Sequence, residues 1–254
     1  MEPTQAQNID EVIEILEGII QSAETHQNSM GYFAALYKRV TLQVKKGIEE
    51  GFFEDNKRME ALDVIFANRY LAAYFAYQNQ QPNTLSWIKA FDLTKQYWPI
   101  VLQHLLIGMN AHINLDLGIA AATVSKGKDI KLLQGDFNKI NQILSELVKK
   151  VEDELSLIWP PLKWILDRTR KIDQVLVDFS MELARDGAWK FATQLADTAP
   201  ENWVKKIKER DEKVARKADI VTNPGFFVKA LLRIVRLGER GSVSARIQEL
   251  DSLY

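Results

Sequence analysis

Hydrophobic residues recur along the chain at the three- and four-residue spacing of amphipathic helices. Asn8 and Glu11 form a capping-box-like start for a helix over residues 10–25. The same periodicity predicts a helix from Ser29 to about Gly51 and another that begins at Asp55. No long strand-rich run and no fixed repeat stands out. The pattern therefore predicts an all-α protein.

One stretch, from Pro99 to Ser125, is apolar enough to be buried on all sides. Proline suits its first turn, where the missing backbone donor is harmless. Its middle nevertheless carries five polar residues, His104, Asn110, His112, Asn114 and Asp116. Because a buried polar group must find a partner, we expect the functional site to include these residues. We predict a single domain, 1–254, of about eight or nine helices packed around this central helix.

Later segments continue the helical pattern. Asp136 is placed to cap a helix that runs to about Ile158. After the break at Trp159-Pro160-Pro161, residues 162–198 read as one long or kinked helix. A helix after Pro200 carries mixed charges, which indicate a solvated face and not a binding patch.

The turn Asn223-Pro224-Gly225 precedes a basic amphipathic segment, so residues 224–254 would form a C-terminal helical appendage. Its apolar side is Phe226, Phe227, Ala230, Leu231 and Ile234. Such a helix either docks on its own core with its arginines in solvent or rests on an anionic membrane. The sequence favours docking on the core.

Composition excludes several classes of function. The formal net charge of -1, with 33 basic and 34 acidic residues, gives no general attraction to nucleic acid. Because the chain has no cysteine, disulfides, Cys-ligated zinc, iron–sulfur clusters and thiol catalysis are absent. The polar, acidic amino terminus lacks a secretory signal, and the polar groups in the central stretch argue against a transmembrane helix. We expect a cytoplasmic protein.

His112 and Asp116 are four residues apart, so on a helix their side chains meet. Three chemistries use such a pair. The two residues would supply ligands to one divalent metal, with Asp136 or His104 as a third ligand. Asp116 would instead orient His112 as a general base for an activated water. In the third interpretation the pair is a buried hydrogen-bond network that fixes helix register.

Other polar residues are candidates for ligand contacts. Arg69 falls on the apolar stripe of its helix, as either a structural ion pair or a ligand-facing charge. Asn110 and Asn114 lie roughly opposite His112 around the helix axis. Asn141 sits among apolar neighbours, and Arg185 precedes Trp189 by one turn, which would let its guanidinium lie against the indole.

The run Asn110-Ala111-His112-Ile113-Asn114-Leu115-Asp116-Leu117 resembles the N-A-H-I-N-x-D-L motif of a bacterial domain family of unknown function. A second family motif is similar to Asp136 followed five residues later by Asn141. Arg69-Tyr70, Ala184-Arg185 and Ala188-Trp189 also look family-like, and the resemblance spans roughly residues 30–200. It implies an all-α fold and a shared polar site, and it brings no established activity.

The leading functional hypothesis is a small-molecule site with His112 and Asp116 as catalytic residues, extended to metal-assisted hydrolysis if a divalent metal binds. Arg69, Asn110, Asn114, Asn141 and Arg185 would contact the ligand, and Asp136 would complete the metal set. One alternative is a non-catalytic helical module that binds an apolar or lipid-like ligand. Another is a purely structural polar network, closed and dry.

Overall fold

Helices make up nearly all of the regular structure in residues 5–140, 142–143 and 181–252, which are the residues that the computed structural model describes. No strand occurs among them, so the predicted all-α class is confirmed. The chain starts with α1 (Ile9–Thr25), α2 (Met30–Glu49), α3 (Asn56–Gln78) and α4 (Leu85–Leu93). The later helices described are α10 (Met181–Ala196), α11 (Trp203–Thr222), α12 (Phe226–Gly238) and α13 (Val243–Ser252), with short 3-10 turns at Ile130–Leu133 and Pro200–Asn202.

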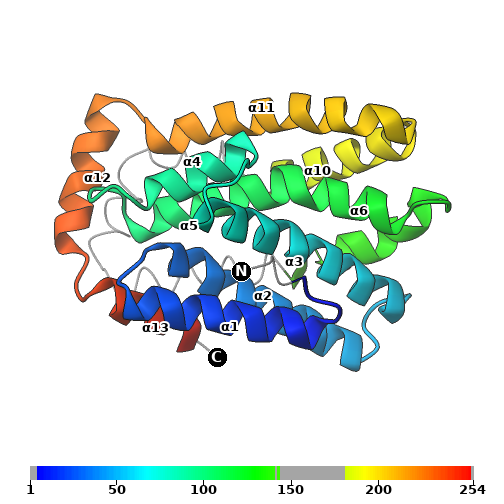
Figure 1. Cartoon of the computed structure of the whole chain (residues 1–254), viewed down its shortest axis with the longest axis horizontal. Coiled ribbons are helices and arrows are strands. Elements are labelled where there is room, and N and C mark those ends of the chain that lie inside the picture. The colour runs from blue at the N-terminus through cyan, green and yellow to red at the C-terminus, as the bar shows by residue number, and fades with distance from the viewer. Residues whose placement is uncertain (1–4, 141, 144–180, 253–254) are drawn as a thin grey trace.

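The predicted central helix is confirmed, but it is not uniform. It consists of α5 (Val101–Ala111), a π-helical turn η1 (His112–Leu117) and α6 (Gly118–Val124), which follow one another without a break. Helices α2, α4 and α11 pack against α5, while α3 and α10 pack against α6, so this rod lies in the middle of the bundle (Figure 1). By length and apolarity Val101–Val124 is the one described helix that could cross a membrane, and it is enclosed within the fold as a core helix would be.

Two glycines allow the rod to approach its neighbours closely. A Cβ atom at Gly108 would collide with the ring of Phe33 on α2. A Cβ atom at Gly118 would lie 2.8 Å from Cδ1 of Phe191 on α10. The helix-weakening glycines therefore correspond to close contacts with aromatic rings.

Asp136 does not cap its own helix as predicted, because that helix already begins at residue 134. Its carboxylate is fully buried and accepts hydrogen bonds from the backbone N–H groups of Glu54 (2.7 Å) and Asp55 (3.1 Å). Arg58 adds an ion pair, with 2.9 Å between Nη2 and Oδ2. Asp136 therefore ties the chain after the central rod to the start of α3.

The last two helices differ in how they pack. Helix α13 lies against α1 and α2, where Ile247 fills the space beside Gly31. Helix α12 buries only Val228 and Val235. Phe226, Phe227 and Ile234 are exposed, so the expectation that this apolar side docks on the core is wrong.

Asp136→Asn should lower the free energy of unfolding by about 2 kcal/mol, because a neutral amide replaces a buried carboxylate that accepts from three donors. Urea denaturation followed by circular dichroism measures the change. Asp129→Asn is the matched control: Asp129 caps an exposed turn through the N–H of Lys131 alone (3.0 Å), so we expect a smaller loss. Equal losses in the two variants would contradict the assignment.

Candidate functional site

The π-helical turn η1 holds both members of the predicted pair. All six of its residues, His112 to Leu117, are buried. A π-helical turn widens the helix, is rare, and is frequently found at functional sites. The most polar part of the rod therefore also has the least regular backbone.

The carboxylate of Asp116 has no exposure to solvent and is bonded by three side chains. Oδ1 lies 3.1 Å from Nε of Arg69, and Oδ2 accepts from Nε1 of Trp87 at 2.8 Å. Nδ1 of His112 lies 3.3 Å from the same Oδ2. The predicted His112–Asp116 contact and the pairing of Arg69 are both present, and they join α3, α4 and η1.

The charges of the pair follow from these contacts. Burial alone would raise the pKa of Asp116, but the Arg69 guanidinium and the bonds from His112 and Trp87 outweigh it, so the pKa is lowered. Burial lowers the pKa of His112, and Asp116 offsets this only in part. Asp116 is thus ionised and His112 neutral, with the Nδ1 proton facing the carboxylate. Nε2 of His112 is left as a proton acceptor.

Aromatic rings enclose the imidazole of His112. The ring of Phe66 stacks on it with 3.6 Å between centroids and 8° between planes. Tyr37 meets it edge-on at 4.5 Å, and the rings of Phe33, Trp87 and Tyr70 lie at 5.8, 5.9 and 6.1 Å. The polar pair is therefore held in a low-dielectric environment.

Several polar atoms in this cage have no hydrogen-bond partner within the described part of the chain. They are Nε2 of His112, the hydroxyl of Tyr70, Oδ2 of Asp63, and the hydroxyl of Tyr37, which has the Thr41 side chain nearby but no hydrogen bond of good geometry. Asp63, Phe66 and Tyr70 share one face of α3 by their spacing. Buried polar atoms are normally paired, so this concentration calls for an explanation.

Burial also perturbs the ionisation of these groups. Burial raises the pKa of Asp63 to about 7, and the charge of Glu60 adds to the effect. Burial, followed by the nearby charges of Asp63 and Asp116, raises the pKa of Tyr37 well above its usual value. Burial does the same to the pKa of Tyr70. Both phenols are therefore neutral donors at pH 7.

Sequence reasoning missed this part of the site. Neither Tyr37 nor Asp63 is among the candidate residues predicted from the sequence. The helical spacing of Asp63 with Phe66 and Tyr70 was the available signal, because it places a carboxylate on an aromatic face.

A narrow crevice leads from the surface between α2 and α4 to the outer side of the cage. Its volume is about 20 Å³, enough for one water molecule. Phe33, Tyr70 and Trp87 line its inner part together with Gly108 and His104. The same three rings contact the imidazole of His112, so they separate the crevice from it.

Asn110 and Asn114 do not join the His112–Asp116 pair. Nδ2 of Asn110 donates to the carbonyl oxygen of Val214 on α11 at 2.9 Å, and Asn114 donates to Asn110 at 3.1 Å. The backbone carbonyl of Asn114 accepts from Nε of Arg210 at 2.8 Å. These asparagines therefore attach the rod to α11, on the side that their spacing predicted.

The predicted metal set is not brought together. Asp136 contacts Arg58, which precedes Arg69 by eleven residues on α3, a separation of roughly 16 Å along the helix. Among the described residues no group of three or more His, Asp or Glu is placed to hold a metal ion. The oxygens of Asp116 already have protein donors, which is the physical reason that this ligand set fails.

The remaining candidates are His104, Arg185 and Asn141. His104 lines the crevice with its Nδ1 unpartnered in the described structure, and burial lowers its pKa to about 3. Arg185 is buried on α10. Asn141 lies outside the described residues.

Most of the chain matches a known sequence family. The model of a family of unknown function matches residues 9–224, which include α1 to α11 and the whole of the His112 cage. No curated protein and no solved structure matches the chain.

Asp63 should make stability depend on pH between about 4 and 7. In this range the unfolded chain loses the Asp63 proton while the folded protein keeps it, so stability falls as pH rises, by up to about 4 kcal/mol. Asp63→Asn keeps the neutral shape and should reduce this fall. Urea denaturation of both proteins at several pH values measures it, and parallel pH profiles would contradict the shift.

Proposed function

Because the chain belongs to DUF5995, a family of unknown function, we propose a function from its geometry: it binds a small polar molecule in the His112 cage. The proposal rests on the group of unpartnered atoms, His112 Nε2 and the Tyr37 and Tyr70 hydroxyls, gathered within one aromatic enclosure. A ligand with a donor for the imidazole and an acceptor for the phenols would satisfy all three. Its binding would remove the cost of leaving them unpaired.

The His112–Asp116 pair suits general-base chemistry on such a ligand. Asp116 fixes the ring and the tautomer of His112, which leaves Nε2 free to take a proton from a hydroxyl or a water. Arg69 keeps Asp116 ionised, because its guanidinium forms the ion pair through Nε. Hydrolysis is the reaction class that this arrangement would support. The proposal includes no metal, because the described residues offer no third ligand.

Entry requires the cage to open. The crevice between α2 and α4 ends at the rings of Phe33, Tyr70 and Trp87, which are therefore the gate. Rotation of these rings would connect the crevice to Nε2 of His112. The closed crevice has a volume of about 20 Å³, enough for one water molecule, so any larger ligand enters only after these rings rotate.

One observation favours a second candidate, the purely structural network. Every oxygen of Asp116 has a donor, and the network joins α3, α4 and η1 in the core. In that case the cage is closed and needs no ligand. The two candidates differ in the role of the Tyr37 and Tyr70 hydroxyls, which bind a ligand in the first candidate and only form part of the closed core in the second.

Tyr37→Phe and Tyr70→Phe remove only those hydroxyls. If they serve a ligand, each substitution should raise the free energy of unfolding of the ligand-free protein by about 1 kcal/mol, because an unsatisfied buried group is lost. The same substitutions, and His112→Ala, should remove any small molecule that co-purifies with the protein. Urea denaturation and native mass spectrometry give the two readouts.

Tyr77→Phe is the control, because its hydroxyl already donates to Asp92 at 2.6 Å and its loss should not stabilise the protein. No retained molecule in the wild type, together with a loss of stability in Tyr37→Phe and Tyr70→Phe, would favour the structural network and overturn the binding site.

A further inference from the structure

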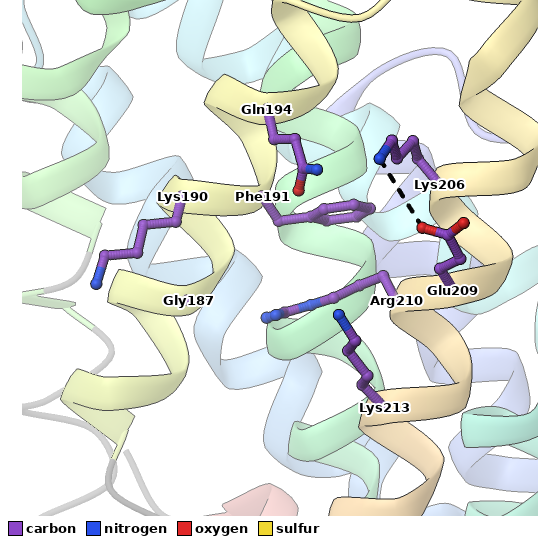
Figure 2. Close-up of a pocket in the computed structure, with 8 residues that line it drawn as sticks. All are labelled: Gly187, Lys190, Phe191, Gln194, Lys206, Glu209, Arg210 and Lys213. Carbon is purple, nitrogen blue, oxygen red and sulfur yellow. Dashed lines mark ion pairs between the residues drawn. The ribbon is translucent and has the colours of Figure 1, made fainter.

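A cavity of about 160 Å³ lies between α10 and α11, away from the His112 cage (Figure 2). Phe191 and Gly187 of α10 form one side, and Lys206, Arg210 and Lys213 of α11 form the other. The one acidic residue that lines it, Glu209, is only loosely paired with Lys206 at 3.9 Å. Positive charge therefore dominates the cavity, although the sequence suggests only a solvated helix face.

Arg210 is held in place and still has donors to offer. Its Nε donates to the carbonyl oxygen of Asn114 at 2.8 Å, and its guanidinium lies 5.4 Å from the centroid of the Phe191 ring. Figure 2 shows the guanidinium flat beneath that ring, with Lys213 reaching toward it. Gly187 leaves room beside it, since a Cβ there would come 3.1 Å from Nη2. The terminal N–H groups of this guanidinium have no hydrogen-bond partner among the described residues, and a guanidinium fixed in this way is suited to bidentate binding of an oxyanion.

We propose that this cavity binds the phosphoryl group of a small phosphorylated molecule, with Arg210 as the anchoring residue and Lys206 and Lys213 as supporting charges. Phosphate presents several acceptor oxygens, which the guanidinium of Arg210 and the amino group of Lys213 would bind from the same side of the Phe191 ring, while Lys206 adds charge from the other side (Figure 2). The size of the cavity fits a small anion, not a polymer. The proposal does not depend on the His112 cage.

The test uses the purified full chain with inorganic phosphate and phosphatidic acid vesicles as separate probes. Phosphate should raise the unfolding temperature relative to chloride at equal ionic strength, and isothermal titration calorimetry gives the dissociation constant. Arg210→Gln and Lys213→Gln should each weaken phosphate binding by roughly tenfold. Binding to the vesicles without binding of free phosphate would assign the site to a lipid headgroup.

Lys208→Gln is the matched control, an equal loss of charge on the exposed side of α11 outside the cavity. Arg210→Gln also removes the bond to Asn114, so Lys213→Gln decides the outcome if that variant unfolds. An equal effect of Lys208→Gln and Lys213→Gln would mean nonspecific charge screening and would overturn the site. So would the absence of any binding to either probe.

A second, independent observation concerns α12. Phe226, Ile234 and Leu237 are 81%, 59% and 71% exposed, and with Ala230 they follow one another at four-, four- and three-residue spacing. They therefore form a continuous apolar ridge on the outer side of the helix, opposite the buried Val228 and Val235. An exposed apolar ridge of this kind marks an interaction surface.

Positive charge and interfacial aromatic residues border this ridge. Lys229 and Arg233 lie along its edge, while Arg236 beside them donates to the Tyr97 carbonyl and is ion-paired with Glu239, which directly follows the helix. The guanidinium groups of Arg233 and Arg236 lie 5.1 Å from the ring centroids of the exposed Trp98 and Tyr97, respectively. Basic side chains beside tryptophan and tyrosine match the headgroup region of an anionic bilayer. In Figure 1, α12 stands across one end of the bundle, where a flat surface could reach it.

The geometry points to the α12 ridge as a docking surface for an anionic lipid membrane. The protein should co-sediment with vesicles that contain phosphatidylserine and not with pure phosphatidylcholine, and added salt should weaken the binding. Phe226→Ser combined with Leu237→Ser should abolish co-sedimentation, and Lys229→Gln combined with Arg233→Gln should reduce it severalfold. Val204→Ser, at an exposed valine on α11, is the matched control.

Light scattering on the same variants tests whether a second copy of the chain, and not a membrane, covers the ridge. A wild-type dimer that the ridge substitutions dissociate would make the ridge a contact between copies of the chain and overturn the membrane assignment. Equal co-sedimentation of the wild type and the ridge variants would overturn it as well.

Discussion

The buried carboxylate of Asp116 is the constraint on which the rest of the structure depends. An ionised group in the core is tolerated only when its hydrogen-bonding capacity is met from all sides. Arg69, Trp87 and His112 meet it from α3, α4 and the π-helical turn. Helices α3 and α4 are therefore each fixed to the rod through one side chain. The aromatic cage follows from this, because its rings occupy the remaining space around the imidazole.

Parts of this arrangement could be predicted from the sequence. The apolar run with embedded polar residues identified the central rod, and four-residue spacing identified the His112–Asp116 contact. Arg69 could be singled out because a charge on an apolar stripe needs a partner. These features are local, since a helical period of 3.6 residues fixes which side chains share a face.

Other features depend on contacts between segments that are far apart in the sequence, and the spacing of residues along one helix does not predict such contacts. Asp136 binds the start of α3 because the chain after the rod passes there, and that contact removes it from the His112 pair. The outer ridge of α12 and the inner Val228–Val235 side are both apolar, so the sequence could not say which one the core would take. Tyr37 is similar: its hydroxyl is unusual only because nothing among the described residues bonds it.

The π-helical turn also changes the direction in which the side chains of α6 point relative to those of α5. Its wider hydrogen bonding accommodates an extra residue, so α6 is rotated relative to the direction that α5 alone would give it, by about 100° per residue. This offset lets Gly108 face Phe33 of α2 while Gly118 faces Phe191 of α10. A deletion of one residue within His112–Leu117 would return the rod to regular α geometry and turn one of these glycines away from its ring. Insertions and deletions within this stretch should therefore disrupt the fold, whereas surface loops tolerate them.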